Sequence, residues 1–429
     1  MSARILILSG IQLSTNPRVV KEADTLAGAG HDVEVVGALL EPFLGERDRV
    51  LHRGKGWKYT ELIDAEATHP GARLGWLAAR ARRRAWRGLN ARFGVENPNQ
   101  LGYVAREMLR YALRNPADLT IVHNPQGVWA GAELIRHGRK VAVDMEDWYS
   151  EDVLAADASR YPVKSLKRWE KYALRGSDFS TTTSSRLSEA LTLAYACSAP
   201  TVVYNSFSLD ERKSLDGEKR DRRDLSLPSI CWFSQVIGPS RGLETLMDAL
   251  PDVDSLFEIH LRGRSTAEYR ESLLARAPDA WRTRIYFHAS IPHADLLPRI
   301  AEHDLGLAME IPCNRSRELT ITNKLPTYLL AGIPVLASET EGQKEAAGLA
   351  EGAIVIFPAE RPRELAAALS SMLSDRVRLG VLAGRAALAA ERVFCWEKSA
   401  PVILGEVART LGKASRSQAR AASVRTSPK

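Results

Sequence analysis

Residues 230–243 read ICWFSQVIGPSRGL. The first four of these residues form an unbroken apolar run, which predicts a strand buried on both faces, as in a parallel sheet flanked by helices. A loop with Gly238 and Gly242 follows the run. Apolar residues then recur at helical spacing, at Leu243, Leu246, Met247 and Leu250. The stretch therefore predicts a strand, a loop and a helix in succession, which is the repeating unit of a doubly wound α/β fold.

Similar apolar runs recur throughout the chain, and the residues between them leave room for helices. The runs lie at 5–8, 33–36, 119–122, 141–143, 179–183, 201–204, 230–233, 257–261, 285–287, 305–308, 334–337 and 354–357. This alternation predicts an α/β protein with two Rossmann-like, doubly wound parallel-sheet domains that face each other across a cleft. Ligands of such sheets bind beyond the carboxyl ends of the strands, so functional residues should follow these runs.

The composition is that of a core-forming protein. The chain has 429 residues, of which 45% are hydrophobic and 26% are charged, and this excludes a disordered chain, a collagen-like chain and a disulfide scaffold. No stretch has the roughly 18 uncharged apolar residues that a membrane-spanning helix needs. The N-terminal apolar run is too short for a secretory signal, and the four cysteines form no C-x-x-C pair. We therefore expect a cytoplasmic protein without disulfides.

Positive charge is concentrated in two segments. The formal net charge is +7, yet residues 73–92 hold seven arginines and no acid, and the tail 412–429 holds five basic residues and no acid. Within 73–92, a helix would place Leu74, Leu77, Ala81, Ala85 and Leu89 on one face. It would place Arg73, Arg80, Arg84 and Arg87 on another, flanked by Trp76 and Trp86.

A basic amphipathic helix with tryptophans favours docking at an anionic membrane surface. We therefore expect a peripheral protein at the inner face of the membrane. The alternative is a surface helix that packs through its alanines. Nucleic acid is not an expected partner, because no nucleic-acid fold signature accompanies the arginines. The Ser-, Ala- and Arg-rich tail 412–429 is predicted to lack regular structure.

The first apolar run leads into a loop with a single glycine, Gly10. Pro17 after Asn16 is a good signal for the start of a helix. The dinucleotide fingerprint G-x-G-x-x-G is absent, which argues against a nicotinamide cofactor. The loop either approaches a sugar ring or an acceptor, or it is a plain connection between a strand and a helix, and the residues leave both open.

Two cations of the second half lie where helices are predicted to begin. Arg241 follows the loop with Gly238, and Lys324 follows Asn323, a plausible N-cap. A cation opposes the helix dipole at this end unless an anion joins it. The pair therefore predicts a diphosphate site, although a solvated surface arginine and an ordinary cap are the alternatives.

Carboxylates follow one strand of the first half. Asp144, Glu146 and Asp147 come directly after the run 141–143, and His123 follows the preceding run. Such a cluster can position acceptor hydroxyls or accept a proton. The alternative is helix capping with a satisfied histidine. Asp252 and Asp254 follow a predicted helix instead of a strand, so we expect no metal there.

Four blocks in order resemble GT-B fold glycosyltransferases, especially the nucleotide-sugar-dependent glycosyltransferase family 4. The blocks are 18–30, 238–243, 323–335 and 394–397. The resemblance implies transfer of a sugar, with retention at the anomeric carbon, from a nucleotide-diphosphate donor, a UDP- or GDP-sugar, to a glycan or lipid-linked acceptor. It implies no cofactor and a role in cell-surface polysaccharide or glycoconjugate synthesis.

The resemblance also assigns roles to residues. Arg241 and Lys324 would stabilise the diphosphate, and Glu318 or Thr327 would hold hydroxyls of the ribose or sugar. The further donor-binding residues would be Gly238, Gly242, Gly263, Thr322 and Asn323. Residues on the acceptor side would be Gly10, His123, Glu146 and Asp147.

Two departures from the family pattern concern the donor site. The family commonly has two glutamates in its donor helix, and the matching positions here are Leu319 and Thr327, with Glu318 one residue away. The family also often has an arginine six residues before its phosphate lysine, where this chain has Gln235 and Arg241. A sugar-nucleotide epimerase of the same fold, or a scaffold without catalysis, is therefore an alternative to the transferase.

The expected organisation has five parts. Residues 1–205 form an acceptor-side domain, 206–228 a solvated linker, and 229–395 a nucleotide-sugar-binding domain. A terminal helix at 396–411 crosses back to the first domain, and the tail 412–429 follows.

Overall fold

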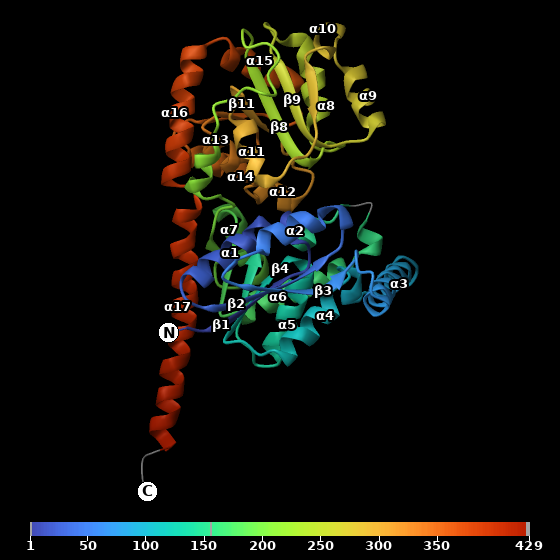
Figure 1. Ribbon diagram of the computed structural model, residues 1–429, viewed down its shortest axis with the longest axis vertical. Helices are drawn as coiled ribbons and strands as arrows, with labels where there is room; N and C mark the ends of the chain where they lie inside the picture. The colour runs from blue at the N-terminus through green and yellow to red at the C-terminus, as the bar shows by residue number, and fades with distance from the viewer. Residues whose placement is uncertain (1, 155–156, 426–429) are drawn as a thin grey trace. The chain divides into compact units, whose positions relative to one another are not determined.

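The computed structural model describes residues 2–154 and 157–425, with side chains described as far as residue 412. The chain divides into two compact units. Unit 1 comprises residues 1–203 and 400–429, and unit 2 comprises residues 204–399. Each unit is built around one parallel sheet with helices on its faces (Figure 1).

Unit 1 contains a seven-stranded sheet in the order β3-β2-β1-β4-β5-β6-β7, and all its strand pairs are parallel. The strands are β1 (Arg4–Ser9), β2 (Asp32–Leu39), β3 (Lys58–Asp64), β4 (Leu119–His123), β5 (Val141–Met145), β6 (Phe179–Thr182) and β7 (Thr201–Val202). The helices are α1 (Pro17–Gly28), α2 (Gly45–His52), α3 (Pro70–Phe93), α4 (Ala105–Arg114), α5 (Asn124–Arg136), α6 (Val163–Gly176) and α7 (Ser185–Tyr195).

Unit 2 contains a six-stranded parallel sheet in the order β10-β9-β8-β11-β12-β13. The strands are β8 (Ser229–Val236), β9 (Glu258–Arg264), β10 (Ile285–His288), β11 (Leu305–Ala308), β12 (Val335–Ser338) and β13 (Ile354–Phe357). The helices are α8 (Leu243–Ala249), α9 (Ala267–Arg276), α10 (Asp279–Arg282), α11 (His293–Ile300), α12 (Arg315–Leu319), α13 (Lys324–Ala331), α14 (Glu341–Leu349), α15 (Pro362–Leu373) and α16 (Arg376–Arg392).

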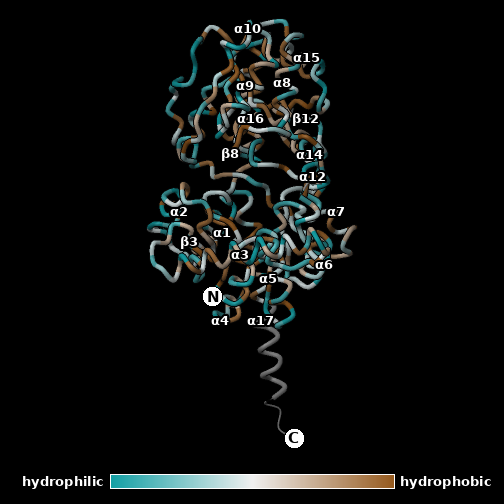
Figure 2. Tube along the Cα trace, turned by 90° about the vertical axis from the view of Figure 1, so that its right-hand side faces the viewer, coloured by the Kyte–Doolittle hydropathy of each residue, from teal (hydrophilic) through white to brown (hydrophobic). Residues whose placement is uncertain are grey.

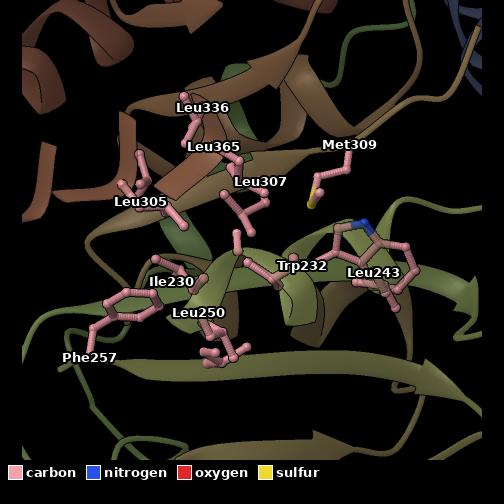
Figure 3. Close-up of a cluster of buried hydrophobic side chains, with 14 of the residues drawn as sticks. Ile230, Trp232, Leu243, Leu250, Phe257, Leu305, Leu307, Met309, Leu336 and Leu365 are labelled. Carbon is pink, nitrogen blue, oxygen red and sulfur yellow. The ribbon is translucent and has the colours of Figure 1, made fainter. Parts of the chain in front are cut away.

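The apolar runs form the strands because their side chains are buried on both faces. In β8, Ile230 and Trp232 belong to one apolar cluster, and Cys231 between them belongs to another. The first cluster includes side chains of α8 and α15, and Figure 3 shows Trp232 in it beside Leu243 and Met309. The second cluster includes side chains of α11, α13 and α16. Helices therefore cover both faces of the sheet, as the fold prediction requires, while hydrophilic segments lie mostly along the periphery of each unit (Figure 2).

Helix α1 begins where the sequence predicts. The Asn16 side chain accepts a hydrogen bond from the backbone N–H of Val19, and Pro17 occupies the first helical position. Gly30 follows the helix with a φ of 87°, a conformation that glycine adopts without steric cost.

The segment 206–228 differs from the solvated linker that its composition predicts. It belongs to unit 2, and the Arg222 side chain is only 4% exposed. Its Nε donates to Glu258 Oε2 at 2.8 Å, and its Nη1 lies 3.2 Å from Asp304 Oδ2. Salt bridges to residues far along the chain therefore compensate for the few apolar side chains of this segment.

The last helix, α17 (Trp396–Arg425), is longer than predicted. It starts at the expected residue, and its residues from 400 onward group with unit 1, where Glu406 Oε1 accepts a hydrogen bond of 2.9 Å from Thr201 Oγ1. The tail 412–429 was expected to lack regular structure, but the helix continues to Arg425 because alanine, arginine, lysine and glutamine favour helix. Residues 426–429 lie outside the described residues. Among the helices that are described, none combines the length and the apolar character that crossing a membrane requires.

Candidate functional site

The strand order of each sheet reverses beside the strand that comes first in its unit. The reversal lies between β1 and β4 in unit 1 and between β8 and β11 in unit 2. Loops that leave a sheet in opposite directions at such a point open a crevice, where ligands of α/β proteins bind. The loops after these four strands are therefore the candidate functional regions, one set in each unit.

In unit 2, the loop after β8 is held close to the end of β11. Gly242 has a φ of 79°, and a Cβ atom there would lie 2.8 Å from Met309 Cβ and 3.0 Å from its carbonyl oxygen. A side chain at 242 would therefore collide with Met309. Gly238 has no such constraint, since a Cβ atom there would meet only Val236 at an ordinary 3.4 Å.

Arg241 lies in this loop, directly before Gly242, and is half-buried. Among the described residues, no side chain or carbonyl forms a hydrogen bond or an ion pair with its guanidinium. The loop also contains Ser240, whose carbonyl oxygen lies 3.5 Å from Nη1 of Arg317. The loop after β8 therefore has two guanidinium groups beside it.

Lys324 occupies the first position of α13, as predicted, and is held by a carboxylate of the same unit. Its Nζ lies 2.7 Å from Glu310 Oε1, which also accepts a hydrogen bond of 3.3 Å from Thr322 Oγ1. Burial alone would raise the pKa of Glu310, but the charge of Lys324 and its hydrogen bond outweigh burial and lower that pKa. The Lys324 ammonium also lies 5.8 Å from the ring centroid of Trp232.

These contacts bring the two predicted cations to one edge of the sheet. Gly242 packs against Met309, the next residue is Glu310, and Glu310 binds Lys324. Arg241 and Lys324 therefore both lie around the carboxyl end of β11. Glu310 and Arg317 were missed by sequence reasoning, although a lysine at a helix start already indicated that an anion must lie nearby.

The other predicted donor residues take several positions. Oε1 of Glu318 accepts a hydrogen bond of 3.2 Å from the backbone N–H of Glu341 at the start of α14. Asn323 is exposed and precedes α13, but its side chain makes no capping hydrogen bond. The hydroxyl of Thr327 donates to the carbonyl of Asn323 at 2.7 Å. Gly263 lies within β9, where a Cβ atom would lie 2.5 Å from the carbonyl oxygen of Ser234, so packing alone accounts for this glycine.

In unit 1, His123 at the end of β4 is fully buried between carboxylates. Its Nε2 lies 2.9 Å from Glu22 Oε2, and its Nδ1 lies 3.2 Å from Glu146 Oε1. Asn16 donates to the same oxygen of Glu146 at 2.9 Å. Burial opposes a charged ring, but the carboxylates, Glu22 first, raise the pKa of His123 to about 10. The carboxylates around the ring therefore favour its protonated form.

Arg18 and Asp144 complete this ionic cluster. Arg18 Nε donates to Asp144 Oδ2, and Nη1 donates to the Val203 carbonyl at 2.6 Å. Burial would raise the pKa of Asp144, but the charge of Arg18 lowers it below its usual value. Burial raises the pKa of Glu22. The cluster was predicted in part, because the carboxylates and the histidine were expected to meet, while Arg18 and Glu22 were not assigned to it.

Glu22, His123 and Asp144 also have the spacing of metal ligands, since one ligand atom from each lies within 4.8 Å of the others. Both ring nitrogens of His123 already face carboxylates, and Arg18 already supplies a cation to Asp144. A histidine can bind a metal only through an unprotonated nitrogen. The arrangement therefore fits an internal ion cluster better than a metal centre.

The loop after β1 is covered by a side chain of α5. A Cβ atom at Gly10 would lie 2.6 Å from Gln126 Cδ. The Gly10 amide donates to Asn124 Oδ1 at 3.2 Å, and Asn124 itself has a φ of 65°. Asp147 follows Glu146 in the loop after β5 and is half-buried. Gly10 therefore serves the close approach of β1 and α5.

Two family models match the chain. A model described as "Glycosyl transferase 4-like domain" matches residues 15–206, and one described as "Glycosyl transferases group 1" matches residues 228–375. The chain therefore contains a glycosyl transferase 4-like domain and a glycosyl transferases group 1 domain. The match confirms the resemblance found in the sequence and confirms that the protein is an enzyme, a glycosyltransferase.

Solved structures confirm the fold class of this glycosyltransferase as GT-B. The sucrose-phosphate synthase of Thermosynechococcus elongatus is 17% identical, with a TM-score of 0.68 over 96% of this chain and 99% of that one. Anabaena HepE, solved in complex with UDP, is 16% identical, with a TM-score of 0.66 over 96% and 100%. A putative UDP-N-acetylglucosamine 2-epimerase of Listeria monocytogenes is 12% identical, with a TM-score of 0.56 over 95% and 96%. No curated protein matches the chain significantly.

In helix α3 of the glycosyltransferase Ala79 is buried, but Ala81 and Ala85, which share a face with the leucines, are exposed. Leu74 and Leu77 are 67% and 48% exposed, and Leu89 and Phe93 are exposed as well. Arg80 and Arg84 are exposed beside them. The apolar face of this amphipathic helix is therefore turned away from unit 1.

The tryptophans of α3 lie on its inner side. The ring of Trp76 packs edge-on against Tyr103, with centroids 4.8 Å apart, and Trp86 is also half-buried. Arg87 lies 3.6 Å from Asp157. Of the five residues predicted for a membrane surface, only Arg80 and Arg84 are thus fully on the outer side.

Proposed function

We propose that unit 2 binds the diphosphate of a nucleotide sugar, a UDP- or GDP-sugar, at the carboxyl ends of β8 and β11. The observation that carries this proposal is Arg241, a half-buried guanidinium that no described residue pairs. A half-buried cation without a partner is costly in a folded protein, and a bound phosphate would compensate it. HepE, a structure of the same fold, was solved with UDP, which supports a nucleotide as the ligand but does not bear on its position.

The proposed reaction retains the configuration of the sugar. The bond from the anomeric carbon to the diphosphate breaks, a bond from that carbon to an acceptor hydroxyl oxygen forms on the same face, and the leaving phosphate takes the hydroxyl proton. The enzyme then supplies charge and no nucleophile. Arg241 and Lys324 stabilise the negative charge that develops on the diphosphate, which is the largest effect such a site can exert. Glu310 holds Lys324 in place before the donor arrives.

The proposed acceptor is a glycan or lipid-linked sugar used in the synthesis of a cell-surface polysaccharide or glycoconjugate. Glu146 is the member of the unit 1 cluster that reaches solvent, with 17% of its side chain exposed, while His123 is fully buried. His123 therefore acts as a positioning residue, because it orients the Glu146 carboxylate. That carboxylate can accept a hydrogen bond from an acceptor hydroxyl.

The proposed site of action is an anionic membrane surface, which α3 contacts. The exposed leucines at 74, 77 and 89 would enter the interface between headgroups and acyl chains, and Arg80 and Arg84 would bind anionic headgroups. The exposure of this apolar face supports the proposal, because a helix that only served the core would turn its leucines inward.

Calorimetric titration with UDP, GDP and ADP tests the donor site. One nucleotide should bind the wild-type chain and lose most of its affinity in Arg241→Ala and in Lys324→Ala. Each variant should also lose transfer activity equivalent to about 2–4 kcal/mol of transition-state stabilisation. Lys344→Ala is the matched control, since Lys344 is an exposed lysine on α14. Unchanged binding in both site variants would refute the assigned cations.

Product analysis separates a transferase from an epimerase, which the structural likeness to a putative epimerase makes the second candidate. A transferase releases nucleotide diphosphate and forms a glycoside only when an acceptor is present. An epimerase changes the free donor without any acceptor. Conversion of donor alone, at a rate that acceptors do not alter, would overturn the transferase.

Flotation with vesicles tests the membrane surface. The wild-type chain should float with vesicles that contain phosphatidylglycerol and should not float with neutral vesicles. Leu74→Ser with Leu77→Ser should abolish binding, while Leu193→Ser should keep it, since Leu193 on α7 is an even more exposed leucine, at 85%. Equal flotation of all three proteins would exclude α3 as the contact.

A further inference from the structure

Helix α12 holds its two arginines in different surroundings. Asn314 caps this short helix, since its side chain accepts a hydrogen bond of 2.9 Å from the backbone N–H of Arg317. Ser316 and Leu319 are buried and anchor the helix in unit 2. Arg315 is exposed, whereas Arg317 is half-buried. The two arginines therefore allow a comparison of one guanidinium in solvent with one held against the protein.

The Arg317 guanidinium reaches the loop that carries Arg241. Its Nη1 lies 3.5 Å from the carbonyl oxygen of Ser240, the residue directly before Arg241. Ser240 has a φ of 60°, a strained conformation for a residue with a Cβ atom. Strained residues persist only where their surroundings hold them, and they cluster at ligand sites. The loop after β8 is therefore held in an unfavourable shape, with Arg317 beside it.

Arg317 also acts on the partner of Lys324. Glu310 binds Lys324 at 2.7 Å. Burial would raise the pKa of Glu310, but the charge and the hydrogen bond of Lys324, and after them the charge of Arg317, lower it. Arg317 thus lies close to the neighbour of Arg241 on one side and to the partner of Lys324 on the other.

A third cation at this edge of the sheet favours an anionic ligand. Cations that gather at one place repel one another, because the energy of like charges rises as they approach. A diphosphate attracts each of them and offsets that repulsion. Arginine suits this task better than lysine, since its planar guanidinium donates two parallel N–H groups to one phosphate.

We propose that Arg317 is a third cation of the donor site and binds the diphosphate of the nucleotide sugar together with Arg241 and Lys324. This role rests on the proposed function and adds a binding residue to it. The contact with the Ser240 carbonyl, at 3.5 Å, is at the outer limit of a hydrogen bond. A charged phosphate oxygen forms the stronger hydrogen bond with the same N–H, so the guanidinium turns to the donor when it arrives.

Calorimetric titration with nucleoside diphosphates and monophosphates tests this role. The wild-type chain should bind UDP more tightly than UMP, or GDP more tightly than GMP. Arg317→Ala should weaken the diphosphate by roughly 10- to 100-fold. It should weaken the monophosphate less, because attraction to a cation grows with the charge of the ligand. Arg315→Ala is the matched control on the same helix and should bind like the wild type.

A conservative variant separates phosphate binding from support of the loop. Arg317→Lys keeps the charge and should lose less diphosphate affinity than Arg317→Ala. If Arg317 only held the Ser240 carbonyl, its loss would weaken diphosphate and monophosphate by the same factor. Equal factors, or an unchanged diphosphate affinity in folded Arg317→Ala, would overturn the proposal. Circular dichroism reports folding, and Arg317→Lys is judged by the same two ligands if Arg317→Ala does not fold.

The variants Arg241→Ala and Lys324→Ala, titrated in parallel, distinguish a failure of this role from a failure of the proposed function. Loss of diphosphate binding in these two variants, with none in Arg317→Ala, would keep the donor site and remove only Arg317 from it. A wild-type chain that binds none of the four nucleotides would overturn both.

Discussion

Gly242 illustrates a backbone position at which the chain depends on glycine. Its φ of 79° strains any residue with a Cβ atom, and the Cβ atom would also collide with Met309. We predict that Gly242→Ala lowers the free energy of unfolding by about 1–2 kcal/mol from backbone strain alone. Urea denaturation followed by circular dichroism measures this. Gly238→Ala, with only an ordinary contact at 3.4 Å, is the control and should unfold like the wild type.

Glu170 on α6 makes stability depend on pH. Its Oε1 accepts a hydrogen bond of 2.9 Å from the Ser150 amide, and its Oε2 contacts the hydroxyls of Ser150 and Tyr195 at 2.5 Å. Burial raises the pKa of Glu170 from 4.5 to about 7. The folded chain thus keeps a proton that the unfolded chain releases above pH 4.5. The stability contribution is complete below pH 4.5 and is lost as the pH rises to about 7.

We predict that Glu170→Gln removes this pH dependence, because the amide stays neutral at every pH. The free energy of unfolding of the wild type should fall by roughly 2–4 kcal/mol between pH 4.5 and 7.5 from this group, and that part of the fall should be absent in the variant. Urea denaturation at several pH values measures the difference. Glu218→Gln, at an exposed glutamate, should keep the wild-type profile, and an unchanged profile in Glu170→Gln would contradict the prediction.

At the scale of single residues, the sequence predicted where the site residues lie but not which side chains they contact. The positions of Arg241 and Lys324 followed from local signals, since an apolar run, a loop and a helix start are neighbours in the chain. The carboxylate of Glu310, which binds Lys324 at 2.7 Å, follows a different strand. A lysine in the first turn of a helix indicates a nearby anion, but a bound phosphate and a carboxylate from a distant part of the chain satisfy it equally well. The roles of these residues remain predictions.

At the scale of secondary structure, the sequence predicted the strands that are buried on both faces. Each of the twelve apolar runs coincides with a strand to within three residues at either end. Strand β3 was missed because it lies at an edge of its sheet, and its residues KYTELID are mostly half-exposed or exposed. The segment 206–228 was misjudged for a related reason. Arg222 of this segment pairs with Glu258 and Asp304. Both partners are far away in the sequence, so no local sequence pattern identifies them.

Helix α1 is fastened to β5 by the buried pair of Arg18 and Asp144. We predict that Arg18→Met lowers the free energy of unfolding by about 3–5 kcal/mol, because it takes the nearest cation from the buried carboxylate. Thermal and urea denaturation measure this loss. Arg53→Met removes an exposed arginine and should change stability by less than about 0.5 kcal/mol.

A second substitution identifies the cause of that loss. If the unpaired carboxylate of Asp144 destabilises Arg18→Met, adding Asp144→Asn should restore part of the stability, because the substitution removes that negative charge. If the losses in unfolding free energy of the two single variants add up in the double variant, the packing of the Arg18 side chain, not its charge, stabilises α1. The comparison is a double-mutant cycle between residues in direct contact.

At the scale of the whole molecule, the two units share a strand order. They differ in the charged side chains that lie where this order reverses. In unit 1 the ends of β4 and β5 carry His123 and Asp144, and these form a buried ionic cluster with Arg18 and Glu22. In unit 2 the corresponding loops carry Arg241, which has no partner among the described residues, and Lys324 with one carboxylate. The same topology thus yields paired charges of both signs in one unit and unpaired positive charge at Arg241 in the other.

This difference predicts how the molecule responds to a nucleotide. A ligand that binds only the folded chain stabilises it by RT ln(1 + [L]/Kd), about 2.7 kcal/mol when the ligand is present at 100 times its Kd. UDP or GDP, whichever binds, should therefore raise the midpoint of thermal unfolding in a concentration-dependent way. The increase should be lost in Lys324→Ala and kept in Lys344→Ala, whose lysine lies on the exposed side of α14. An equal increase in both variants would mean that the diphosphate binds away from the carboxyl end of β11, and the proposed division of roles between the two units would then be wrong.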